Sequence, residues 1–139
     1  MYHSKKIALF ISHIFGDYQR NVCQGVVDQA AEYGFKTEIY ATSSDGEDLG
    51  EYGSGEASIL RIPNFEDFSG IVMASGTYPA QELKDQIIEL IKVADCAVVH
   101  IGLQYDIYRV IDAAFQFCHR QSSICKFFFD VLVILRQTR

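Results

Sequence analysis

Short, continuously apolar runs recur along the chain, and they constrain its fold more than any other feature. Residues 7–11 read Ile-Ala-Leu-Phe-Ile, residues 71–74 read Ile-Val-Met-Ala, and residues 96–101 read Cys-Ala-Val-Val-His-Ile. A strand with one face in water alternates apolar and polar side chains, whereas a strand covered on both faces does not. Residues 35–41 alternate and are rich in β-forming residues, so we expect a further strand there.

Helical periodicity fills the segments between these runs. We expect a first helix with Asp17 as its N-cap and Gly34 as its C-terminal stop. A short helix is expected over residues 56–62, and a longer one over residues 79–94, which Pro79 opens. The apolar positions at helical spacing are Val22, Val26, Val27, Ala30 and Ala31 in the first helix and Leu83, Ile87, Leu90, Ile91 and Ala94 in the last. This alternation predicts the α/β class, with a doubly wound parallel sheet covered by helices on both faces.

The charge and the cysteines of the chain indicate which binding partners and which cellular compartment to expect. The net charge is −6, so the clustered Lys and Arg of a nucleic-acid-binding surface are not expected. No apolar run is long enough to cross a membrane, and the N-terminus lacks the pattern of an export signal. The cysteines have no C-x-x-C spacing, which predicts buried thiols in a protein of a reducing compartment. We therefore expect a cytoplasmic domain that binds neither nucleic acid nor a membrane.

The sequence lacks the motifs of the common α/β enzymes. There is no G-x-G-x-x-G frame, no phosphate-binding Gly-Lys-Ser/Thr and no G-x-S-x-G elbow. Cys118 and His119 have no second pair at metal-ligand spacing. The acidic residues 45–56 lack the pattern of a calcium loop and are expected to be a solvated loop. We expect no enzyme activity, no cofactor and no metal.

The loops after the strands are the candidate ligand site, because α/β proteins bind ligands beyond the carboxyl ends of parallel strands. The candidate ligand-binding residues are Ser12, His13, Phe15 and Tyr18 after the first strand and Ser75, Thr77 and Tyr78 after the third, with residues 102–103 after the fourth. Hydrogen bonding to ligand hydroxyls and aromatic stacking are the roles that these residue types suggest. The alternatives are helix capping by the polar residues and ordinary packing by the rings. His100 is expected to be a hydrogen-bonded core histidine.

Stretches within residues 5–103 resemble the N-terminal lobe of the LacI/GalR-type sensor domain, which has the type I periplasmic-binding-protein fold. They are Lys-Lys-Ile-Ala-Leu-Phe-Ile-Ser at 5–12, Gln-Gly-Val at 24–26, Glu-Tyr-Gly-Phe at 32–35, Phe-Ser-Gly-Ile-Val-Met-Ala-Ser at 68–75 and Cys-Ala-Val-Val-His-Ile-Gly at 96–102. Ser69 stands where this family usually has Asp. Residues 45–50 and 55–64 are similar to a bacterial subgroup in which such sensors precede signalling as well as DNA-binding output domains.

This resemblance implies one lobe of a non-catalytic sensor in a transcriptional or signalling regulator. Such a domain holds a small-molecule effector, sugar- or nucleoside-sized, between two lobes and can form a homodimer. We expect no DNA-binding segment before Lys5 and no second lobe, and therefore no direct binding of nucleic acid by this chain.

Residues 104–139 are expected to be a separate, atypical hydrophobic tail. The net charge changes from −8 over residues 1–103 to +2 over residues 104–139, and turn-forming patterns are lacking in the second part, although residues 105–119 keep the spacing of a helix. A truncated or frameshifted gene product is one explanation, and a tail that folds back on the lobe is the other. Two rival functions stay open: a small flavodoxin-like enzyme or nucleotide-binding protein, and a gene fragment without function.

Overall fold

A computed structural model describes residues 5–43, 55, 58–78, 81–92, 94 and 96–101. The strands are β1 (Lys6–Ile11), β2 (Lys36–Ala41), β3 (Gly70–Met73) and β4 (Ala97–His100). The α-helices are α1 (Asp17–Glu32) and α3 (Gln81–Ile91), and the 3₁₀ helices are η1 (Ser58–Arg61), η2 (Phe65–Asp67) and η3 (Ser75–Thr77). The predicted strands are confirmed, with ends that differ by one residue at most from the predicted ones.

The strands form one four-stranded sheet in the order β2-β1-β3-β4. Every neighbouring pair is parallel, and Leu9 of β1 lies between Ile39 of β2 and Val72 of β3. The chain leaves β1 for β2 on one side and then crosses to β3 on the other side. The switch in strand order therefore lies between β1 and β3, where ligands bind in doubly wound sheets.

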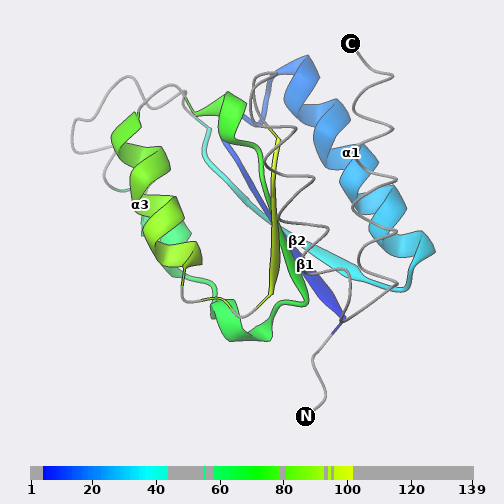
Figure 1. Cartoon of the computed structure of the whole chain (residues 1–139). Coiled ribbons are helices and arrows are strands. Elements are labelled where there is room, and N and C mark those ends of the chain that lie inside the picture. The colour runs from blue at the N-terminus through cyan, green and yellow to red at the C-terminus, as the bar shows by residue number, and fades with distance from the viewer. Residues whose placement is uncertain are drawn as a thin grey trace.

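Both faces of the sheet are covered, as the apolar runs predict. Ile7, Leu9 and Ile11 pack with α1, whereas Ala8 and Phe10 pack with α3, η1 and η2. All of β1 from Ile7 onward is fully buried. Figure 1 shows α1 and α3 on opposite sides of the sheet, with β1 in its middle. The structure is thus an α/β fold built on an all-parallel sheet.

The ends of α1 show why the helix occupies these residues. At its C-terminus Gly34 has φ 76°, the Gly34 N–H donates to the Ala31 carbonyl over 3.0 Å, and the Phe35 N–H donates to the Ala30 carbonyl over 2.8 Å. This is the Schellman arrangement, and it confirms Gly34 as the stop. At the N-terminus the predicted cap is wrong by one residue. Gly16 is the N-cap without a side-chain hydrogen bond, and Asp17 is the first helical residue.

Other differences concern short elements. The helix predicted over residues 56–62 corresponds to η1 in the part that the structure describes, and η2 was not expected. The Asn64 side chain begins η2 by accepting from the Glu66 N–H. The helix predicted over residues 79–94 is α3. Pro79, the acidic residues 45–54, residues 102–103, Cys118, His119 and the tail at 104–139 lie outside the described residues.

Candidate functional site

Hydroxyl groups connect the carboxyl ends of β1, β2 and β3. Ser12 and Thr42 directly follow β1 and β2, Thr77 ends η3 after β3, and all three residues are buried. Thr42 Oγ1 donates to Ser12 Oγ over 2.9 Å, and the Ser12 N–H donates to Thr77 Oγ1 over 2.9 Å. Thr77 Oγ1 in turn donates to the Ala74 carbonyl over 2.7 Å. The two loops that were predicted as a ligand site therefore meet at the switch in strand order.

His13, which directly follows Ser12, occupies a strained backbone position. Its φ of 56° is in the left-handed region, which residues other than glycine rarely adopt. The His13 carbonyl accepts from the Gly16 N–H over 3.0 Å, and the Ile14 N–H donates to the Thr42 carbonyl over 3.2 Å. These bonds hold a tight turn between β1 and α1 that leaves the His13 side chain exposed. Backbone strain of this kind is common at ligand sites.

Ser75 and His100 meet at the ends of β3 and β4. Ser75 Oγ lies 3.0 Å from His100 Nδ1, and both residues are half-buried. The Gly76 N–H donates to the Ile101 carbonyl over 3.1 Å, which ties the same two strand ends together. His100 was expected in the core. It is hydrogen-bonded, but it lies at the edge of the core and next to a predicted site residue.

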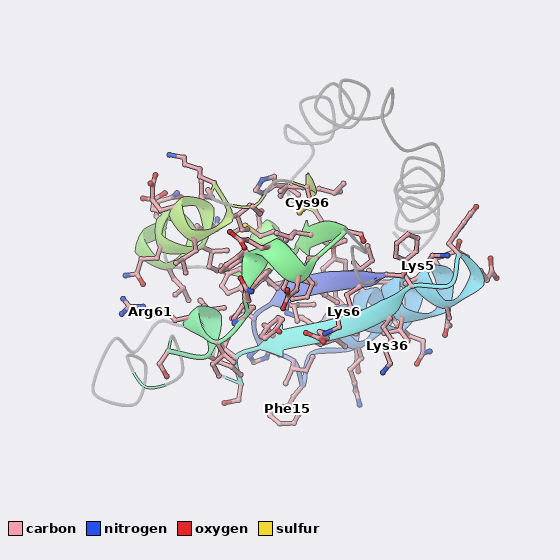
Figure 2. The ribbon with its side chains drawn as sticks, turned by 90° about the horizontal axis from the view of Figure 1, so that it is seen from below. Lys5, Lys6, Phe15, Lys36, Arg61 and Cys96 are labelled. Carbon is pink, nitrogen blue, oxygen red and sulfur yellow. The ribbon has the colours of Figure 1, made fainter. Side chains whose placement is uncertain are left out.

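Phe15 and Tyr18 are the exposed aromatic residues of the β1–α1 turn. The exposed fraction is 73% for Phe15 and 43% for Tyr18. Figure 2 shows the Phe15 ring pointing away from the ribbon. Since packing on the sheet edge was the alternative for Phe15, its exposure favours the view that the ring is available to a ligand or a partner.

Tyr78 lies in the core, although it was predicted beside the ligand. Its exposed fraction is 1%, and it belongs to the hydrophobic cluster that contains Phe10, Leu83 and Ile87. The Tyr78 hydroxyl is buried without a hydrogen-bond partner among the described residues. Burial raises the pKa of this phenol. In the described structure this residue therefore belongs to the core and not to the exposed part of the site.

The side chains gathered at the strand ends carry hydroxyl and imidazole groups. Among the described residues, the charges nearest in sequence to Ser12 and His13 are those of Asp17 and Arg20 in the first turn of α1, and they pair with each other. A second ion pair, between Lys6 Nζ and Glu38 Oε1 at 2.9 Å, lies on the adjacent strands β1 and β2. Hydrogen bonds from Lys6 and Tyr40 lower the pKa of Glu38. In the part of the chain that the structure describes, the strand-end site is therefore polar without a dominant charge.

A groove of about 730 Å³ runs between η1 and α3. It is lined by Leu60, Arg61, Gln81, Asp85, Gln86, Glu89 and Leu90. None of the predicted ligand-binding residues lines it. We take the strand ends as the candidate site, because polar side chains from three loops converge there at the switch in strand order, whereas no residue of those loops lines the groove between η1 and α3.

The described part of the chain contains neither a metal-binding cluster nor a membrane-spanning helix. Its His, Cys, Asp and Glu side chains form no group that could hold a metal ion. None of its helices has the length and apolar character needed to span a bilayer.

Thr42 and His100 belong to this site and were missed in the sequence. Each had a usable signal, because Thr42 directly follows the second predicted strand and His100 is the last polar residue of the fourth. Sequence reasoning misses Thr42 because the acidic residues 45–56 shortly after it predict only a solvated loop. His100 was assigned to the core because its neighbours in sequence are apolar.

Comparisons with known proteins give no relative: no family model, no curated protein and no solved structure matches this chain. The four-stranded parallel sheet is shared by many α/β proteins and does not by itself indicate a periplasmic-binding-protein lobe. A function must therefore be argued from the strand-end site.

Proposed function

We propose that the carboxyl edge of the sheet binds an uncharged small molecule, sugar- or nucleoside-sized, without transforming it. The chain would then be the N-terminal lobe of a LacI/GalR-like sensor domain in a bacterial transcriptional or signalling regulator of the cytoplasm. The observation that carries the proposal is the bond from the Ser12 N–H to Thr77 Oγ1, which joins the loops after β1 and β3. It supports a single site formed by both loops.

The side chains at the strand ends favour a neutral ligand with hydroxyls. His13 is exposed, Ser75 and His100 are half-buried, and the exposed ring of Phe15 offers an apolar face. Imidazole and hydroxyl groups both donate and accept hydrogen bonds, and aromatic rings stack on sugar or base faces. Such a combination of a few polar groups beside an aromatic ring is typical of small-molecule sites.

The same geometry argues against a flavodoxin-like nucleotide site. In such sites the backbone N–H groups after the first strand and the N-terminus of the first helix bind a phosphate. Here the Ser12 N–H already donates to Thr77 Oγ1, and the Ile14 N–H donates to the Thr42 carbonyl. The first turn of α1 also contains the Asp17 carboxylate, which would repel a phosphate.

Binding is tested by titrating the 139-residue chain with a panel of sugars and nucleosides and measuring NMR chemical shifts and heats of binding. We expect dissociation constants weaker than about 1 μM, because one lobe supplies only part of the contacts that bury such a ligand. Phe15→Ala should weaken binding, and Ile62→Ala is its matched control, since Ile62 is 72% exposed and does not belong to the strand-end site. Failure of every ligand to shift residues 12–18 or 75–77 would refute the proposal.

The contact between Ser75 and His100 favours a second candidate, ester hydrolysis. Ser75 Oγ would attack the ester carbonyl carbon while its proton passes to His100 Nδ1. The leaving alkoxide would take that proton and depart as an alcohol, and water would then cleave the acyl-serine. The amides that follow Ser75 weigh against this reaction, because the Gly76 and Thr77 N–H groups donate to Ile101 and Ala74 carbonyls and are not available to an oxyanion.

A fluorophosphonate probe separates the two candidates. Covalent labelling of the chain that disappears in Ser75→Ala would establish Ser75 as a nucleophile and overturn the non-catalytic proposal. Absence of labelling, together with binding of an unmodified ligand, would support it. His100→Gln retains a hydrogen-bonding side chain and distinguishes a role in holding Ser75 from a role as a base.

A further inference from the structure

The groove between η1 and α3 has the size of a small-molecule site, with a volume of about 730 Å³. Its apolar part consists of Leu60 from η1, which is buried, and Leu90 from α3, which is half-buried. The other lining residues are polar or charged, and they are Arg61, Gln81, Asp85, Gln86 and Glu89. The groove therefore combines an apolar surface with charged side chains from both of its walls.

The α3 wall of the groove is acidic. Gln81, Asp85 and Glu89 follow one another at intervals of four residues, so they lie in one row on the helix. Gln81 Nε2 donates to Asp85 Oδ1 over 2.9 Å, which orients this carboxylate but leaves its charge unbalanced. Glu89 pairs with Lys92 near the end of the helix. Among the described residues, Asp85 is therefore the groove carboxylate that has no cationic partner.

Arg61 is the cation of the opposite wall. It is the last residue of η1, it is exposed, and it makes no ion pair with any residue that the structure describes. Figure 2 shows its side chain beside η1, on the side where α3 lies. A guanidinium presents N–H donors in a planar arrangement that matches a carboxylate. Arg61 and Asp85 thus line one groove with opposite charges, yet they form no ion pair with each other.

We propose that the groove between η1 and α3 binds an apolar zwitterion, either a free amino acid or a short peptide with apolar side chains. The ligand carboxylate pairs with Arg61, its ammonium group pairs with Asp85, and its side chains cover Leu60 and Leu90. An anion without a positive group would be repelled by the carboxylates of α3, and a cation without a negative group would be repelled by Arg61. A molecule with both charges matches both walls. The proposal is independent of the strand-end ligand site.

Ligands with one charge removed test this recognition. The 139-residue chain is titrated with leucine, leucyl-leucine, N-acetyl-leucine and leucinamide, and NMR chemical shifts are followed. We expect leucine or leucyl-leucine to shift residues 60–61 and 85–90, with dissociation constants of about 1 mM, because exposed ion pairs contribute little. The two blocked forms of leucine should bind about threefold more weakly than leucine itself. Whichever of leucine and leucyl-leucine binds more tightly identifies the ligand as amino acid or peptide.

Neutralising each wall separates the two contacts. Arg61→Gln should weaken the binding of leucine about threefold and make leucine and leucinamide bind alike, because the ligand carboxylate then has no partner. Asp85→Asn should weaken it similarly and make leucine and N-acetyl-leucine bind alike. Lys36→Gln and Glu66→Gln are the matched controls, since both residues are exposed and neither lines the groove. These controls change the net charge by the same amounts and should leave binding unchanged.

Three results would overturn the proposal. The first is equal binding of leucine and both of its blocked forms to the unmodified chain. The second is unchanged affinity for leucine in both groove variants. The third is the absence of ligand-induced shifts at residues 60–61 and 85–90. If shifts appeared at residues 12–18 and 75–77 instead, the zwitterion would bind at the strand ends, and the proposal for the groove would fail while the strand-end site would gain support.

Discussion

The Ser12 N–H donates to Thr77 Oγ1 over 2.9 Å, although the two residues are 65 positions apart in the sequence. This bond fastens the end of β1 to the turn after β3, across the switch in strand order. Thr77 Oγ1 itself donates a hydrogen bond to the Ala74 carbonyl, so the Thr77 hydroxyl serves both as an acceptor and as a donor. The candidate site consequently depends on one buried side chain that does not need to touch a ligand.

Thr77→Val should lower the free energy of unfolding by about 1–3 kcal/mol, because valine has the shape of threonine but leaves the buried Ser12 N–H without an acceptor. Urea unfolding at neutral pH measures the change. Thr77→Ser keeps the hydroxyl and is the matched control, with a smaller loss. Equal midpoints for the valine variant and the unmodified chain would show that the bond contributes nothing to stability.

Leu9→Ala should cost about 2–5 kcal/mol, because Leu9 is fully buried in the central strand β1 and its removal leaves a cavity. Ile62→Ala removes an apolar side chain that is 72% exposed, and it should change stability by less than about 0.5 kcal/mol. Thermal or urea unfolding of both variants is the measurement. A small effect at Leu9 would contradict a core centred on β1.

The sheet could be predicted from the sequence because its signal is local. The continuous apolar run at residues 7–11 requires cover on both faces, and the structure supplies it with α1 on one side and α3 on the other. The end of α1 at Gly34 could be predicted in the same way, because the residue that follows a helix often adopts the left-handed backbone conformation, which favours glycine. The N-cap was missed because Asp17 and Gly16 are both acceptable caps, and the choice depends on backbone geometry rather than on residue type.

The candidate site was harder to predict, because its contacts join residues that are far apart in the chain. Strand-end position identified Ser12 and Ser75 as neighbours of the switch point, but it did not reveal that Ser75 would bond to His100. Tyr78 has the same strand-end position as these residues, yet it is buried and packs in the hydrophobic cluster with Phe10 and Leu83. Position in sequence specifies the loop, and packing decides which side chains face outward.

Gly34→Ala should destabilise the chain by about 1 kcal/mol or more, because φ at Gly34 is 76° and a Cβ is strained in that region. Steric clash does not contribute, since the nearest atom to an added Cβ is Lys5 Nζ at 3.9 Å. Gly16→Ala is the control: its backbone has φ −68°, and the three atoms nearest to an added Cβ all belong to the flexible Gln19 side chain. Thermal unfolding of both variants should rank Gly34→Ala as the less stable.

Stability should fall as the pH rises from about 10 to about 12, and Tyr40 is one cause. Burial and the hydrogen bond to Glu38 raise the pKa of Tyr40 to about 12, against 10.0 for an ordinary tyrosine. In this window the unfolded chain releases the phenolic proton while the folded chain retains it, so unfolding is favoured. Urea midpoints measured at pH 9, 10 and 11 should decline less for Tyr40→Phe than for the unmodified chain.

Tyr18→Phe serves as the control for that pH series, because the Tyr18 ring is exposed at the start of α1. It should follow the same alkaline decline as the unmodified chain. If Tyr40→Phe showed that full decline as well, the hydroxyl of Tyr40 would have no part in the alkaline loss.

Tyr78→Phe should stabilise the chain by about 1 kcal/mol, because it removes a buried hydroxyl that has no hydrogen-bond partner among the described residues. The ring stays in place in the cluster with Phe10 and Leu83, so no cavity forms. Tyr40→Phe makes the same chemical change where the hydroxyl donates to Glu38 Oε2 over 2.8 Å, and it should be neutral or destabilising at neutral pH. Urea unfolding of the two variants side by side measures this contrast. A loss of stability in Tyr78→Phe would mean that the Tyr78 hydroxyl has a partner in the folded chain, and that the turn after β3 is held by it.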